Sequence, residues 1–81
     1  MIKEKTSNLS LHFAICLDNR GYEVSLQIGK LYRIIPDDSA GVHRYIRVID
    51  ESGEDYAYAS NRFFPVALPP EVENVLLLQA A

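Results

Sequence analysis

The stretch RYIRVIDESGEDYAY (Arg44–Tyr58) carries the clearest structural signal in the chain. Its first half, RYIRVID, is dense in β-branched and aromatic residues, which favour a strand. ESGE follows, and Gly53 stands where a tight connection between strands needs a positive φ. DYAYAS then alternates Tyr56 and Tyr58 with alanines, which is the period of a second strand. The stretch therefore predicts a β-hairpin with both tyrosines on its core face.

The segments before this hairpin also have strand-like patterns. HFAICLD (His12–Asp18) alternates apolar and smaller residues, and the turn-forming DNRGY follows it. In EVSLQIGKLYRII (Glu23–Ile35), the apolar residues of VSLQI fall on one face of a predicted strand: Val24, Leu26 and Ile28. Gly29 permits a sharp change of direction, after which KLYRII resumes as a strand that ends at Pro36. DDSAGVH is predicted to be a loop.

The segments after the hairpin predict a short strand and a helix. SNRF is typical of a 3₁₀ turn, and FPVAL (Phe64–Leu68) of a last short strand. Pro69-Pro70 then opens a helix, because proline is tolerated in a first turn and Glu71 and Glu73 suit the positive end of the helix dipole. This helix carries more apolar residues than one stripe needs, among them Leu77, so it is predicted to pack on the barrel or to form an interface.

With 81 residues, the chain is expected to be one domain with a thin core. It divides into a flexible N-terminal tail at 1–11, a barrel at 12–68 and a C-terminal helix at 69–81. The predicted fold is mainly β: a small barrel of about five antiparallel strands, because closure removes unpaired strand edges that a short chain cannot cover.

Composition and charge exclude several classes of function. The net charge of −3 argues against a non-specific binder of nucleic acid or of anionic membranes, since both need a basic surface. The apolar run VLLL is far shorter than the roughly 20 residues that span a bilayer, and the polar start predicts no signal peptide. One cysteine, Cys16, allows no internal disulfide and fits a reducing compartment. We expect a cytoplasmic protein without a cofactor or metal.

Two segments of the sequence resemble parts of SH3 domains. EVSLQIGKLYRII is similar to the SH3 segment in which an acidic residue and LSF lead into KKGE and a strand, and YASNRFFPV is similar to the SH3 ending IPSNYVAPV. The resemblance covers residues 13–68 and implies an SH3-like barrel, a fold that hosts many unrelated roles. IRVIDESGEDYAY also resembles a group of small bacterial proteins without an assigned activity.

The positions that form the proline-binding groove of SH3 domains have changed. Cys16 and Asp18 replace groove tyrosines, Tyr45-Ile46 replace the tryptophan pair, Ala59 replaces the groove proline, and Arg62 replaces the last tyrosine. Since these aromatic groups grip a polyproline helix, the resemblance does not imply a reader of PxxP motifs.

Each candidate site has a structural alternative. Cys16 could be a nucleophile, but free cysteine usually packs as a small hydrophobe. The carboxylates of two loops could form an electrostatic docking patch, acid–base pairs or a calcium site, or could simply be solvated. These residues are Asp37, Asp38, Asp50, Glu51, Glu54 and Asp55. The tyrosines could form a binding shelf or lie in the core. Arg44, Arg47 and Arg62 could grip RNA.

The predicted function is a non-catalytic protein-interaction or regulatory module, with a nucleic-acid-associated barrel as the alternative and an enzyme a distant third. The partner is expected to be a protein, and self-association through the C-terminal helix is a further possibility. The residues predicted to bind the partner are Asp18, Tyr22, Tyr45, Glu51, Glu54, Asp55, Arg62 and Leu77.

Overall fold

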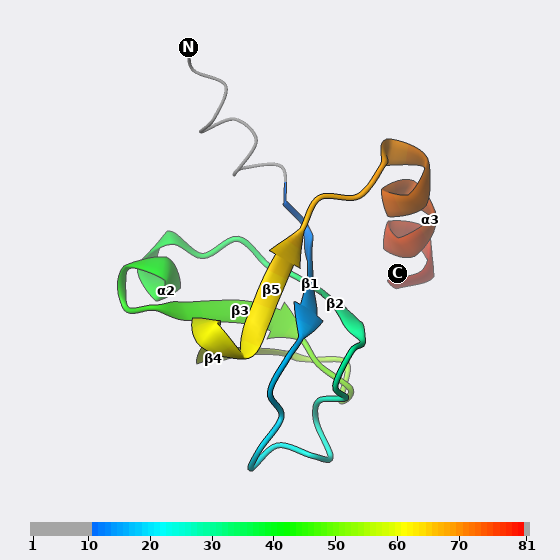
Figure 1. Ribbon diagram of the computed structural model, residues 1–81. Coiled ribbons are helices and arrows are strands. Elements are labelled where there is room, and N and C mark those ends of the chain that lie inside the picture. The colour runs from blue at the N-terminus through cyan, green and yellow to red at the C-terminus, as the bar shows by residue number, and fades with distance from the viewer. Residues whose placement is uncertain (1–10, 81) are drawn as a thin grey trace.

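The computed structural model describes residues 11–80 and shows a mainly β chain with a C-terminal helix (Figure 1). The predicted flexible tail therefore lies, apart from Leu11, outside the described residues. The elements in chain order are β1 (Phe13–Cys16), β2 (Leu31–Arg33), α2 (Asp38–Val42), β3 (Tyr45–Ile49), β4 (Asp55–Ala59), the 3₁₀ turn η1 (Ser60–Arg62), β5 (Phe63–Val66) and α3 (Pro70–Ala80).

The strands form two antiparallel sheets. One has the order β2-β1-β5, and the other is the predicted hairpin β3-β4. The mainly β class, the antiparallel pairing and the C-terminal helix are confirmed.

The prediction of a closed barrel is not confirmed, because the two sheets do not close within residues 11–80. β2 is too short to belong fully to both sheets, and it reaches β3 only through an isolated bridge between Ile34 and Val48. η1 interrupts the chain between β4 and β5. A closed barrel needs continuous hydrogen bonding between neighbouring strands, and this is missing between β2 and β3 and at the β4–β5 connection.

The hairpin β3-β4 has the predicted turn, with Gly53 at a φ of 86°. Its register pairs Ile46 with Tyr58 and Val48 with Tyr56, so these side chains share one face. Tyr58 is buried in the core, whereas Tyr56 is half exposed, so the prediction that both tyrosines are in the core is wrong for Tyr56. Tyr56 lies two residue pairs nearer the turn of the hairpin than Tyr58.

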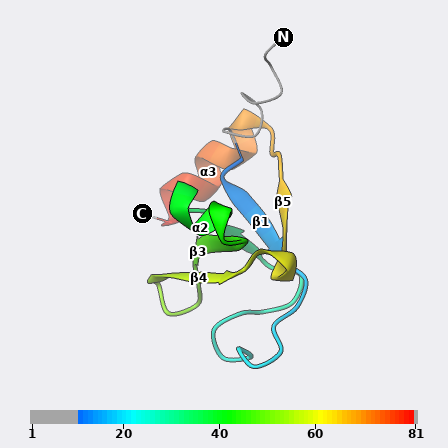
Figure 2. The same cartoon turned by 90° about the vertical axis from the view of Figure 1, so that its left-hand side faces the viewer.

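Residues 17–30 form a long loop rather than the predicted strand over VSLQI. Leu26 is fully buried, but Val24 is 92% exposed and Ile28 is 58% exposed. The backbone turns repeatedly here, and the amide of Leu26 donates to the carbonyl of Tyr22 at 2.9 Å. Gly29, at a φ of 83°, makes the predicted change of direction into β2. The loop and α3 lie toward opposite ends of the molecule in both views (Figures 1 and 2).

The segment DDSAGVH contains a short helix, α2, where a loop was predicted. Asp37 caps it, accepting a hydrogen bond from the amide of Ala40 at 3.0 Å. The second carboxylate oxygen of Asp37 accepts from the Nε of Arg47 on β3 at 2.9 Å. The cap and the ion pair together stabilise a helix that is too short to form alone.

The C-terminal helix α3 leaves much of its apolar surface open. Leu76 and Leu77 are half buried, while Val72, Val75 and Leu78 are exposed. Glu73 joins the helix to the start of β1, where its Oε2 lies 2.8 Å from Nδ1 of His12.

The core contains side chains from every strand and one from the long loop. It comprises Ala14, Cys16, Leu26, Tyr32, Val48, Tyr58 and Phe63, with Ile34 and Ile46 packed against it. Cys16 is fully buried, as the packing interpretation predicts, and this burial raises the pKa of its thiol.

Burial predicts that Cys16 reacts slowly. We expect a thiol reagent such as DTNB to label it at least ~100-fold more slowly in the native protein than in the unfolded protein, since the chain must open first. A Ser60→Cys variant is the matched control, because this exposed position should add one fast-reacting thiol. Labelling of native Cys16 at the rate of the control would contradict the packing.

Candidate binding site

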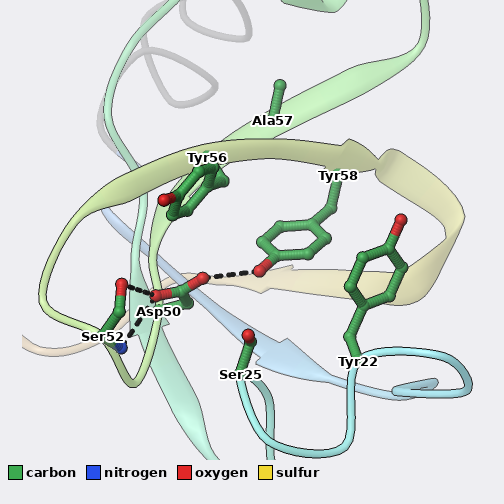
Figure 3. A pocket seen from close by; sticks show the side chains of 7 residues that line it. All are labelled: Tyr22, Ser25, Asp50, Ser52, Tyr56, Ala57 and Tyr58. Carbon is green, nitrogen blue, oxygen red and sulfur yellow. Dashed lines mark hydrogen bonds between the residues drawn. The ribbon is translucent and has the colours of Figure 1, made fainter.

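A backbone hydrogen bond and an ion pair join the turn of the β3-β4 hairpin to the long loop. The amide of Glu51 donates to the carbonyl of Ser25 at 3.0 Å and thereby holds the loop against the hairpin. A hollow of about 360 Å³ lies at this junction (Figure 3). We call it the tyrosine hollow, and its lining residues are Tyr22, Ser25, Asp50, Ser52, Tyr56, Ala57 and Tyr58.

Asp50 is the buried charged group of this hollow, with only 5% of its surface exposed. It follows β3 directly, so the alternation of the strand places it on the face of Val48. The hydroxyl of Tyr58 donates to its Oδ2 at 2.6 Å. The amide and hydroxyl of Ser52 donate to its Oδ1 at 2.9 and 2.5 Å (Figure 3).

These hydrogen bonds determine the charge of the hollow. Burial alone would raise the pKa of Asp50, but the hydrogen bonds from Ser52 and Tyr58 favour the ionised form and hold the pKa below its ordinary value. Burial and the neighbouring carboxylate raise the pKa of Tyr58 to about 12. At neutral pH the hollow therefore contains a carboxylate and a neutral phenol.

Tyrosine rings form the walls above this carboxylate. Tyr22 and Tyr58 meet edge to face, with ring centroids 5.0 Å apart. Tyr22 is 44% exposed and Tyr56 is 49% exposed, so both rings border the opening.

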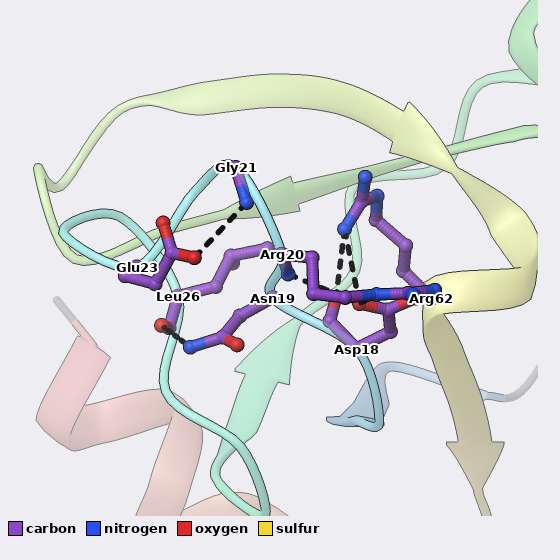
Figure 4. A network of polar contacts seen from close by, with 7 residues as sticks. All are labelled: Asp18, Asn19, Arg20, Gly21, Glu23, Leu26 and Arg62. Atoms are coloured by element: carbon purple, nitrogen blue, oxygen red, sulfur yellow. Dashed lines mark hydrogen bonds and ion pairs between the residues drawn. The ribbon is translucent and has the colours of Figure 1, made fainter.

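Three of the residues predicted to bind a partner, Asp18, Tyr22 and Arg62, meet beside the hollow, and Figure 4 shows the contacts of Asp18 and Arg62. The guanidinium of Arg62 lies 4.7 Å from the ring centroid of Tyr22 and donates to the backbone carbonyl of Asp18 at 3.2 Å. Asp18 also accepts two hydrogen bonds from the side chain of Arg20, which hold its pKa well below the usual range. This network orders the part of the loop that carries Tyr22.

The three predicted acidic residues of the hairpin do not act as one free patch. Glu51 pairs with Lys30 at 2.6 Å and accepts from the hydroxyl of Tyr32, and Asp55 pairs with Arg47 at 3.1 Å. Glu54 is exposed near the hollow, with its Oε1 3.5 Å from the hydroxyl of Tyr56.

The other two predicted residues lie elsewhere. Tyr45 borders a separate hollow of about 340 Å³ with Ala59, beside η1. Leu77 lies on α3, away from both hollows.

Sequence reasoning placed Asp50 among the loop carboxylates and did not predict that it is buried at the bottom of the hollow. A signal was present: Ile46, Val48 and Asp50 alternate, so the last of them falls on the core face, where a carboxylate needs donors. Tyr58 shares that face on the neighbouring strand and is one of those donors.

Two of the three arginines that could bind RNA are already paired with carboxylates of the chain. Arg47 is held by Asp37 and Asp55, and Arg62 by Asp18, so these two cations are already neutralised within the chain. This arrangement weakens the nucleic-acid alternative.

Two further observations concern residues 11–80 only. No three or more His, Cys, Asp or Glu side chains of this part lie close enough together to hold a metal ion. None of its helices is long and apolar enough to cross a membrane.

Comparisons with known protein families, with curated proteins and with solved structures found no match.

Proposed function

We propose that the chain is a non-catalytic protein-interaction module with an SH3-like arrangement of strands, and that the tyrosine hollow is its binding surface. The observation that carries this proposal is the pair of half-exposed rings, Tyr22 and Tyr56, at the opening of a hollow with a buried carboxylate. Aromatic side chains at the edge of a pocket are typical anchors for a protein partner.

The SH3-like arrangement is supported by the order of the elements. A long loop joins β1 to β2, a hairpin joins β3 to β4, and a 3₁₀ turn precedes β5, which pairs with β1. The hollow lies between the long loop and the hairpin, the two segments that vary most freely on such a scaffold.

A non-catalytic role is supported by the ionisation of the hollow. The pKa of Asp50 lies below its ordinary value and that of Tyr58 is raised to about 12. An efficient acid or base has a pKa near the working pH, and neither group meets this condition at neutral pH.

The proposal predicts that partner capture depends on Tyr56. In an affinity capture from extracts of the native cell, followed by mass spectrometry, we expect Tyr56→Ala to reduce recovery of the specific partner at least ~30-fold, the effect of losing one aromatic anchor. Phe64→Ala is the matched control, because Phe64 is an exposed aromatic residue on β5, outside the hollow.

The Phe64→Ala control distinguishes the tyrosine hollow from other exposed apolar surface as the binding site. Equal recovery with Tyr56→Ala and wild type would contradict the proposal. Loss of the partner on truncation after Leu68, with no effect of Tyr56→Ala, would move the binding surface to α3.

A further inference from the structure

The floor of the tyrosine hollow carries a negative charge that no cation of the described chain neutralises. The ion pairs among residues 11–80 involve Asp18, Asp37, Glu51, Asp55 and Glu73, but not Asp50. The donors to Asp50 are all neutral groups. Buried charges in proteins are usually paired, so an anionic hollow that opens to solvent is suited to a cation from outside.

We infer that the tyrosine hollow holds one cationic side chain of a protein partner, a lysine ammonium or an arginine guanidinium, with Asp50 as its counter-ion. This inference rests on the proposed function and names the chemistry that the hollow recognises.

Asp50 has acceptor capacity left for such a group. An ionised carboxylate offers about four lone-pair sites. Ser52 uses two sites on Oδ1, and Tyr58 uses one on Oδ2. The remaining site on Oδ2 can accept from an N–H of the ligand, and the hydroxyl of Ser25 lines the same hollow.

The walls suit the rest of a lysine or arginine side chain. A cation over a tyrosine ring is attracted by the negative face of the ring, and the chain already uses this interaction where Arg62 covers Tyr22. The half-exposed ring of Tyr56 can pack against the aliphatic part of the ligand.

Charge around the opening favours a cation over an anion or a neutral group. Glu54 is exposed beside Tyr56, and the whole chain has a net charge of −3. Both increase the rate of encounter with a basic segment.

The inference is tested with small probes and amide NMR spectra of the full chain. The cationic probes are Nα-acetyl-lysine-N-methylamide and Nα-acetyl-arginine-N-methylamide. Their neutral counterparts contain norleucine and citrulline. We expect the better cationic probe to give saturable shifts at Ser25, Ser52 and Tyr56 with a Kd of about 1–10 mM, a weak affinity typical of one anchored group. The matching neutral probe should bind at least ~10-fold more weakly.

Variants then locate the binding. Asp50→Asn and Tyr56→Ala should each weaken the cationic probe at least ~10-fold, while Phe64→Ala should leave its Kd unchanged. Tyr56 is half exposed, so its variant keeps the test valid if Asp50→Asn fails to fold. Comparing the two cationic probes identifies lysine or arginine as the preferred group.

The outcomes separate this inference from the proposed function. Equal affinity for cationic and neutral probes, no saturable shift, or shifts unaffected by Tyr56→Ala would each overturn the inference. If partner capture depends on Tyr56 but the probes show no charge preference, the proposed function stands and the inference falls. If the cationic probes bind in the hollow but no protein is captured, the preference of the hollow for a cation stands, and both the protein partner and the proposed function fall.

Discussion

Replacing Leu26 with alanine is expected to lower the free energy of unfolding by about 2–5 kcal/mol. Leu26 is fully buried, and it is the core residue that the long loop between β1 and β2 contributes. Truncation would leave a cavity among residues of both sheets, which relax only partly around it. Because a small domain has only about 5–15 kcal/mol of stability in total, this loss is large.

The measurement is guanidinium denaturation of Leu26→Ala beside two controls from the same loop. Val24→Ala and Ile28→Ala remove side chains that are 92% and 58% exposed, so each should change the free energy of unfolding by less than about 0.5 kcal/mol. Equal losses for all three variants would instead indicate the strand that the alternating sequence predicts, and would contradict the loop.

This contrast shows where the sequence is informative about the fold. The hairpin could be predicted because its alternation, β-branched residues and Gly53 all indicate the same structure within a few residues. The alternation of Val24, Leu26 and Ile28 wrongly predicted a strand, because a loop that buries one leucine can have the same short pattern of apolar residues. The hydrogen bond that holds this loop, from the amide of Glu51 to the carbonyl of Ser25, joins residues far apart in the chain.

The helix α2 illustrates a second limit. Asp37 is a good N-cap residue, but five helical residues give no apolar period that a sequence pattern could reveal. Its stabilising partner, Arg47, belongs to β3 and became visible only in the structure.

The candidate site was predictable in part. The sequence comparison with SH3 domains identified Asp18 and Arg62 as changed groove positions. In the structure, Arg62 contacts both Asp18 and the ring of Tyr22. Glu51 and Asp55 were predicted to bind the partner as charged loop residues, but each is paired with a cation within the chain. A list of charges cannot show which of them are already neutralised.

Removing the hydroxyl of Tyr58 is expected to lower the free energy of unfolding by about 1–3 kcal/mol, because it deprives the buried carboxylate of Asp50 of a donor. Asp50→Asn should cost a similar amount. The two groups contact each other, so the double variant should lose less than the sum, with a coupling energy of about 0.5–3 kcal/mol. Tyr45→Phe, at a half-exposed tyrosine, is the control and should be nearly neutral.

The pH dependence of stability gives an independent test of the same pair. The pKa of Tyr58 is raised to about 12 in the folded state, so its contribution is complete below the ordinary pKa near 10 and is lost as the pH rises through about 12. The pKa of Asp50 is lowered, so its contribution is present above the ordinary value near 3.9 and is lost as the pH falls through the folded value. Urea denaturation across pH should therefore show a smaller alkaline loss in Tyr58→Phe and a smaller acid loss in Asp50→Asn than in wild type. Unchanged slopes in both variants, together with additive effects, would show that the phenol and the carboxylate are not coupled in solution.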